Sequence, residues 1–160
     1  MQTVTFFEPD RGRPCDGCTK CCEGWLKTNI YGHEVKRFQP CIFLGKSGCN
    51  IYNVRPDDPC KIFVCEWKAD LNIPEWLKPD KANVIIIKQR LGDFYYDVIV
   101  TAKGPVISEE VHKWADEFSK TRNYNIAIYD DLVANYTIYS SNEEFKKLAA
   151  MTIQAPNFKK

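Results

Sequence analysis

The chain has 160 residues, of which 44% are hydrophobic and 27% charged, and its net charge at pH 7 is +1. This composition is typical of a soluble globular protein and excludes a disordered or fibrous one. The charges are balanced and no segment approaches the about 18 consecutive apolar residues of a membrane span, so we expect neither a nucleic-acid partner nor membrane insertion.

The unusual feature is a group of eight cysteines, all of which lie between residues 15 and 65. They are Cys15, Cys18, Cys21, Cys22, Cys41, Cys49, Cys60 and Cys65. The first four form the run C-x2-C-x2-C-C, and the chain after residue 65 contains none. The sequence therefore predicts a thiol-dense N-terminal module, residues 1–70, and a thiol-free C-terminal part, residues 83–153.

Three interpretations of these thiols compete. A free buried cysteine packs as a small apolar side chain, which explains one or two residues but not four within eight positions. A disulfide framework needs an oxidising compartment, whereas the N-terminal residues lack the basic start and apolar core of a secretory signal. A bond between the adjacent Cys21 and Cys22 would also be strained. We therefore favour metal ligation in a reducing, cytoplasmic setting.

The spacing of the first cysteines suits a metal. In Cys15-Asp16-Gly17-Cys18 the glycine lets the backbone turn tightly, so that both thiolates can face one ion. The continuation to Cys21 also matches the way in which bacterial ferredoxins present three thiolates to an iron–sulfur cluster, with a further cysteine from a distance. Eight thiolates fit two closed zinc sites, or one four-iron cluster with four cysteines left over. Spacing alone does not decide between zinc and an iron–sulfur cluster.

Arg55 is the candidate for support around these ligands. Its planar, forked guanidinium suits a fixed role, donating to ligand sulfur or to nearby backbone. The alternative is an ordinary solvated arginine in a loop. The sequence leaves both interpretations of Arg55 open.

Four segments together resemble a known family. They are CDGCTKCC at 15–22, CIFL at 41–44, GCNIYNVRP at 48–56 and CKIFVC at 60–65. This arrangement resembles the YkgJ-like family of CxxCxxCC-type zinc- or iron-chelating domains, whose pattern runs CxxCxxCC, CxFL, CxIYxxRP and CxxFxC. All eight cysteine positions are present, and the resemblance covers roughly residues 10–68. It implies that these cysteines chelate zinc or iron.

Residues 66–82 form a connector with a single helical turn expected after Pro74. Its two tryptophans, Trp67 and Trp76, are large apolar surfaces. They could seal the cysteine module against the rest of the chain, or form an exposed patch for a protein partner. The sequence leaves both possibilities open.

The C-terminal part shows regular patterning. Two β-branched runs at 83–90 and 94–101, separated by Leu-Gly-Asp, predict a hairpin. A helix follows after Ser108, with an apolar face formed by Val111, Trp114, Ala115 and Phe118. Strands are expected at 124–129 and 132–139, and a last helix begins at the capping box Ser141–Glu144.

The predicted fold is α+β. A small irregular cysteine-rich module folds around its metal and is followed by a mainly antiparallel sheet with two helices, in the order ββαββα. Helices that cover one face of such a sheet would bury both of their apolar stripes.

The sequence favours a metal-binding protein that chelates zinc or iron, including an iron–sulfur cluster, through clustered cysteines. One alternative is an iron–sulfur protein for electron transfer, and another is an adaptor with structural zinc that binds a protein partner. We identify no catalytic residues. A closed, all-cysteine site argues against an enzyme that uses the metal as a Lewis acid, because such an enzyme needs an open coordination position.

Overall fold

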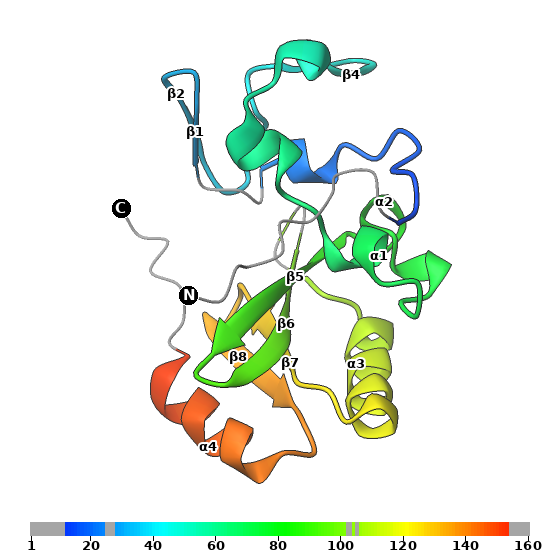
Figure 1. Cartoon of the computed structure of the whole chain (residues 1–160), viewed down its shortest axis with the longest axis vertical. Coiled ribbons are helices and arrows are strands. Elements are labelled where there is room, and N and C mark those ends of the chain that lie inside the picture. Colours follow the sequence, from blue (N-terminus) through cyan, green and yellow to red (C-terminus); the bar gives the residue numbers. More distant parts are fainter. Residues whose placement is uncertain (1–11, 25–27, 102–103, 105, 154–160) are drawn as a thin grey trace.

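The structure, a computed structural model, describes residues 12–24, 28–101, 104 and 106–153. It is an α+β protein with mostly antiparallel strands, as the sequence predicts. In Figure 1 the cysteine-bearing segments lie at one end of the molecule, and a four-stranded sheet with its two long helices lies at the other. The connector between them supplies short helices beside the sheet.

The cysteine-bearing end consists of short elements. Two small antiparallel hairpins are formed by β1 (Thr28–Ile30) with β2 (His33–Val35) and by β3 (Leu44–Gly45) with β4 (Gly48–Cys49). Three helical turns accompany them: η1 (Lys20–Cys22), η2 (Tyr52–Val54) and η3 (Asp57–Lys61). The buried residues Ile30, Val35 and Cys41 form a small core here, separate from the cores of the sheet.

The connector packs closely on the sheet. It contains α1 (Glu66–Ala69), η4 (Glu75–Leu77) and α2 (Pro79–Ala82), and the turn expected after Pro74 is present as η4. Trp67 is only 2% exposed, and the half-buried Trp76 packs against the same core. The two tryptophans therefore seal the connector against the sheet, and the interpretation of an exposed tryptophan patch is wrong.

The sheet has the strand order β5-β6-β7-β8. Its strands are β5 (Val84–Leu91), β6 (Phe94–Thr101), β7 (Ile126–Asp130) and β8 (Asn135–Tyr139). The predicted hairpin is confirmed, since β5 and β6 pair antiparallel with Lys88 opposite Asp97. β6 and β7 run parallel, and α3 (Glu109–Arg122) connects them. The strand expected at 132–139 begins only at Asn135, because residues 131–134 form a turn.

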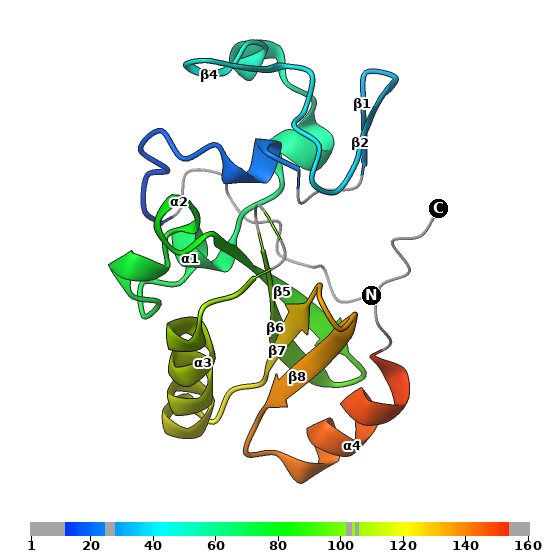
Figure 2. The same cartoon turned by 180° about the vertical axis from the view of Figure 1, so that it is seen from behind.

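The two long helices cover opposite faces of the sheet, so the expectation of a single covered face is wrong (Figures 1 and 2). Val111 and Ala115 of α3 pack on one face together with the connector. Phe145 and Ala149 of α4 (Glu143–Thr152) pack on the other. The physical reason lies in the strands: the central runs are apolar on both faces, and a sheet of that kind must be covered on both sides.

The N-termini of these helices differ from the prediction in detail. Ser108 is the residue before α3, but its side chain makes no capping hydrogen bond. The cap of α4 is Asn142, not Ser141: its side-chain oxygen accepts a hydrogen bond from the backbone N–H of Phe145 at 2.9 Å. The capping box at Ser141–Glu144 is therefore wrong by one residue, because an asparagine oxygen can accept this bond as well as a serine hydroxyl can.

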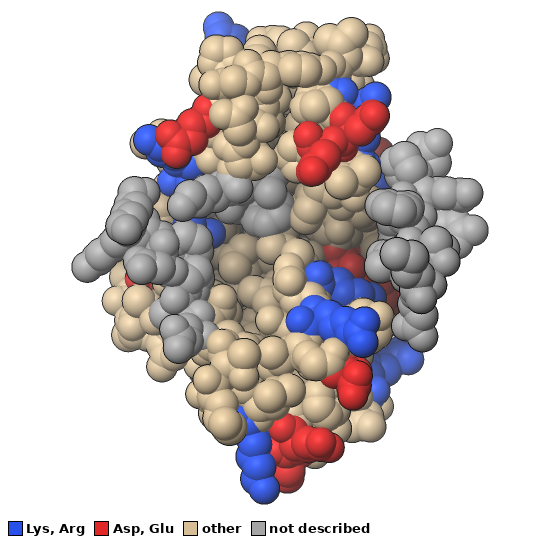
Figure 3. All heavy atoms as spheres, turned by 60° about the vertical axis from the view of Figure 1, so that its left-hand side comes forward, with Lys and Arg blue, Asp and Glu red and all other residues tan. Residues whose placement is uncertain are grey.

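Charged side chains are mixed on the surface. Figure 3 shows Lys and Arg interspersed with Asp and Glu on the face in view, with no large patch of one sign. Among the described residues, no helix combines the length and apolar character that crossing a membrane requires.

Candidate metal centre

The fold gathers the eight cysteines into two neighbouring sets. Four of them, from two distant segments, line one pocket: Cys15, Cys18, Cys21 and Cys65. The other four lie around the small core of the cysteine-bearing end: Cys22, Cys41, Cys49 and Cys60. We call these the first set and the second set. All eight are free thiols.

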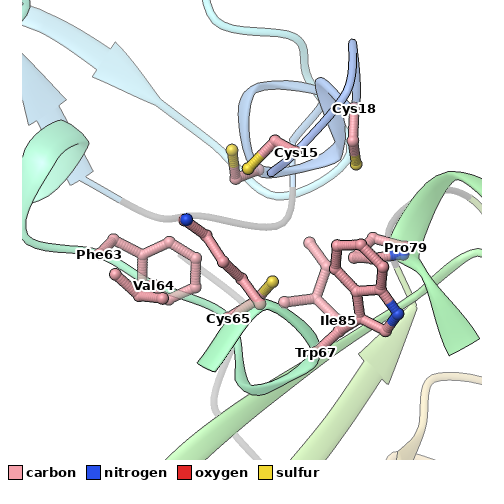
Figure 4. A pocket seen from close by; sticks show the side chains of 10 residues that line it. Cys15, Cys18, Phe63, Val64, Cys65, Trp67, Pro79 and Ile85 are labelled. Carbon is pink, nitrogen blue, oxygen red and sulfur yellow. The ribbon is translucent and has the colours of Figure 1, made fainter. Parts of the chain in front are cut away.

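The first set lies where the cysteine-bearing end meets the sheet. Its pocket encloses about 60 Å³. Figure 4 shows Cys15 and Cys18 on the N-terminal loop at one side of the pocket. Cys65 lies on the opposite side, with its sulfur directed towards them. Residues that are 47 positions apart in the sequence, Cys18 and Cys65, thus face the same space.

A tight turn presents Cys15 and Cys18 on the same side of the loop. The backbone N–H of Cys18 donates to the carbonyl of Cys15 at 3.0 Å. Asp16 and Gly17 between them have φ angles of +45° and +75°. Glycine adopts this left-handed conformation without a steric penalty, so the sequence expectation of a tight turn at Gly17 is confirmed.

The wall of this pocket is mostly apolar. Phe63, Trp67, Pro79 and Ile85 line it together with the thiols, and Ile85 belongs to the sheet itself. Burial, together with the nearby Cys15 and Cys18, raises the pKa of Cys65 to about 11. Burial also raises the pKa of Cys18. The thiols of Cys18, Cys21 and Cys65 are therefore partly shielded from solvent, whereas Cys15 is exposed.

Arg13 and Gly12 fasten the loop of the first set to the connector. The Arg13 guanidinium donates to the backbone carbonyls of Asp70 at 2.8 Å and Ile73 at 2.5 Å. It also stacks 4.4 Å above the centre of the Trp67 ring. At Gly12, a side chain would collide with the carbonyl oxygen of Lys68, 1.9 Å from the position of its Cβ. No motif in the sequence marks either residue, although both lie within three positions of Cys15.

The second set is held by short backbone contacts. The N–H of Cys41 donates to the carbonyl of Cys22 at 2.8 Å, which joins two segments of the set. The N–H of Leu44 donates to the carbonyl of Cys41 at 2.9 Å, and Leu44 pairs with Cys49 across the β3–β4 hairpin. Cys22 and Cys60 pack against the same apolar cluster that buries Cys41. Three separate stretches of chain thus bring these thiols together.

The charges around the second set differ from thiol to thiol. Burial raises the pKa of Cys41 and of Cys60, and the thiols of Cys22 and Cys49 raise both further. A hydrogen bond from the Cys21 thiol lowers the pKa of Cys22 to about 7, and the positive charge of Arg55 contributes. Cys21 and Cys22 are therefore the point at which the two sets touch.

Arg55 lies beside the second set. Its guanidinium donates to the backbone carbonyl of Tyr52 at 2.8 Å and stacks 3.7 Å from the centre of the Tyr52 ring. These two contacts fix the arginine to the segment between Cys49 and Cys60. From there its charge acts on the thiols of Cys22 and Cys60.

The thiols are near one another without being at ligand geometry. In the part of the chain that the structure describes, no three Cys, His, Asp or Glu side chains are arranged so that they could hold one metal ion as they stand. His33, the histidine within the cysteine-bearing segment, is exposed and lies edge-on to Phe43, with ring centres 5.5 Å apart.

One buried ion pair joins the cysteine-bearing end to the turn between β7 and β8. Arg37 donates to both carboxylate oxygens of Asp131, at 3.2 and 2.5 Å, and Thr101 donates to the same carboxylate at 3.0 Å. The side chains of Arg37 and Asp131 are 7% and 9% exposed. No local sequence pattern indicates this pair, because its members are 94 residues apart.

Comparisons of the chain with protein-family models, with curated proteins and with solved structures give no match. The resemblance of the cysteine pattern to the YkgJ-like family therefore stays an expectation.

Proposed function

We propose that this protein binds zinc or iron, the latter as ions or as an iron–sulfur cluster, through its eight N-terminal cysteines. Arg55 supports the cysteines of the second set by its charge. The observation that carries the proposal is the convergence of Cys15, Cys18 and Cys21 with the distant Cys65 around one mostly apolar pocket. A fold that gathers thiols from separate segments, without joining them as disulfides, is typical of a thiolate metal site.

The donors suit these metals. Thiolate sulfur is the preferred ligand of zinc and of iron–sulfur clusters, and four thiolates close a tetrahedral zinc site. Binding would draw the sulfurs closer together than they stand, and Cys15 has room for this movement because it is exposed on a glycine-containing turn. The nearby Arg55, and Lys68 in the wall of the pocket, supply positive charge that would offset a negatively charged thiolate centre.

Electron transfer through an iron–sulfur cluster is the second candidate. The mostly apolar wall of the first set supports it, because the solvent exposure of such a cluster is one of the factors that set its potential. In this case the protein would be coloured and its visible absorbance would fade on reduction. Either function needs reduced thiols, and we place the protein in the cytoplasm for that reason.

Elemental analysis of protein purified without oxygen tests the proposal. We expect zinc, or iron with acid-labile sulfide, bound tightly enough to survive gel filtration. His33→Ala is the matched control, because His33 is an exposed potential ligand in the same segment, and it should leave the metal content unchanged. Protein that binds neither metal, even after refolding with each under reducing conditions, would refute the proposed function.

A further inference from the structure

We infer that the eight cysteines form two separate metal centres, and that the division falls between the adjacent residues Cys21 and Cys22. The inference rests on the proposed function and goes beyond it, since metal binding alone does not say which thiols share a centre. The first centre would use Cys15, Cys18, Cys21 and Cys65, and the second would use Cys22, Cys41, Cys49 and Cys60. Each is a site for a thiolate-binding metal, zinc or iron.

The local backbone explains why the side chains of the adjacent Cys21 and Cys22 point in different directions. Cys21 and Cys22 lie in η1, a 3₁₀ helix. Such a helix has about three residues per turn, so consecutive side chains leave it about 120° apart. Cys21 packs against the core beneath α4, together with Phe63 and Cys65. Cys22 packs instead against the small core around Ile30 and Val35. The two thiols thus belong to different packing environments.

The first centre is defined by a shared pocket. Its four thiols line one space, whereas the wall of that space contains no cysteine of the second set. Figure 4 shows that the loop carrying Cys15 and Cys18 and the segment carrying Cys65 enclose this space from opposite sides. A metal here would connect the N-terminal loop to the residues that lead into α1 and the sheet.

The second centre is defined by backbone pairing within the cysteine-bearing end. The hydrogen bond from Cys41 to Cys22 and the hairpin that carries Cys49 bring three of its members together. Cys60 reaches the same apolar cluster from the helical turn η3. Apart from the contact between Cys21 and Cys22, this set is held by the cysteine-bearing end alone, without the sheet.

Paired substitutions test the division. Cys15→Ser removes one ligand of the first centre, and Cys49→Ser removes one ligand of the second. Because Cys15 is exposed and Cys49 is not fully buried, we expect both variants to fold. Cys65→Ser and Cys60→Ser form a second pair with the same logic. Native mass spectrometry, with zinc, iron and sulfide measured on the same samples, should show that every variant keeps one centre and loses the other.

Two double variants distinguish one shared centre from two separate centres. Cys15→Ser with Cys65→Ser should retain as much metal as either single change, because both residues belong to the first centre. Cys15→Ser with Cys49→Ser should retain little or none. The same measurements identify each centre as zinc or as an iron–sulfur cluster, since only the latter contributes iron and sulfide.

Three results would overturn the division. Loss of all metal in folded Cys15→Ser and in folded Cys49→Ser would mean one shared centre. Loss of metal in the variants of one set only, with wild-type metal content in the variants of the other set, would mean a single centre with four dispensable thiols. Additive loss in Cys15→Ser with Cys65→Ser would place these residues in different centres. Wild-type protein without metal would instead refute the proposed function itself.

Discussion

Gly12 and Arg13 hold the loop of the first cysteine set against the connector. Gly12 has a φ of +98°, and its Cα lies so near Lys68 that no side chain fits. This close approach lets the N–H of Arg13 donate to the Lys68 carbonyl at 3.1 Å, while the Lys68 ammonium donates back to the Arg13 carbonyl at 2.9 Å. A single glycine therefore sets the position from which Cys15 and Cys18 start.

We predict that Gly12→Ala destabilises the protein by more than about 2 kcal/mol, because it adds a backbone collision to the strain of a positive φ. The same change should weaken metal retention by the first set. Gly32→Ala is the control: its φ of +84° gives similar strain, but nothing lies within 4 Å of the new Cβ. Urea unfolding, followed by tryptophan fluorescence, measures the free energy of unfolding of both variants. Equal destabilisation by Gly12→Ala and Gly32→Ala would contradict the prediction.

At the scale of elements, the hairpin of β5 and β6 carries a buried acid. Asp97 is 3% exposed, and the Tyr124 hydroxyl donates to it at 3.3 Å. Glu66 at the start of α1 is also buried and pairs with Lys88 at 3.0 Å. Burial, together with the charge of Glu66, raises the pKa of Asp97 to about 7. Below about pH 7 the neutral form of Asp97 is therefore favoured in the folded protein.

This burial predicts a pH dependence with a definite sign. The folded pKa of Asp97 lies above its ordinary value of 3.8, so the folded state binds more protons than the unfolded state between pH 3.8 and about 7. Stability from Asp97 is fully present below that window and is lost as the pH rises through it, by at most about 1.4 kcal/mol per pH unit.

Asp97→Asn should remove the pH-dependent contribution of Asp97 to stability while keeping the shape of the side chain. The wild-type free energy of unfolding, minus that of Asp97→Asn, should therefore fall between pH 4.5 and pH 7 by about 1 kcal/mol or more. Denaturant unfolding of both proteins across this range checks it, and other titrating groups cancel in the difference. A difference that stays constant or grows with pH would contradict the assignment.

The ion pair of Arg37 and Asp131 joins two elements that lie far apart in the chain, the segment after β2 and the turn before β8. We predict that Asp131→Ala costs about 3–5 kcal/mol, because it leaves the buried guanidinium of Arg37 without its carboxylate. Asp93→Ala is the control, since Asp93 is fully exposed and lies 3.8 Å from Arg90. It should leave the unfolding free energy close to the wild-type value, and an equal effect of the two would refute the prediction.

At the scale of the whole molecule, the cysteine-bearing end and the sheet share contacts. Trp67 belongs to the core beneath α3, and Cys21 and Cys65 pack against the core beneath α4. Farther from the connector, the described residues of the cysteine-bearing end form a single small core around Ile30 and Val35. So small an apolar cluster contributes little folding energy by itself. Metal binding would supply the rest, since structural zinc contributes on the order of 10 kcal/mol.

We therefore predict that a strong chelator under reducing conditions unfolds most of the first 70 residues and leaves the sheet folded, together with α1 and its buried Trp67. Amide hydrogen exchange should lose protection in β1–β4 while the strands β5–β7 stay protected. The same preparation is measured with and without chelator, and the protection of β5–β7 serves as the internal control. Protection lost evenly from residue 12 to residue 150 would mean that both ends form one cooperative unit, and would contradict the division into residues 1–70 and 83–153.

The elements that the sequence predicts correctly depend on neighbouring residues. The β-branched runs around Gly92 fold as the β5–β6 hairpin, and the spacing of Val111 and Ala115 gives the buried face of α3. The turn at Gly17 and the helical turn after Pro74 follow from local backbone preferences in the same way. The spacing of the thiols likewise predicts a metal site, which elemental analysis would test.

The sequence by itself determined the α+β class, the hairpin and the apolar face of α3, because propensity and periodicity act over a few residues. Only the tertiary structure decided that α3 and α4 cover opposite faces, that Arg37 meets Asp131, and that Cys65 joins the thiols of the first loop. These arrangements depend on the parallel crossover between β6 and β7 and on packing between distant segments. No local pattern encodes them, because the energy that selects them arises only when the whole chain is packed.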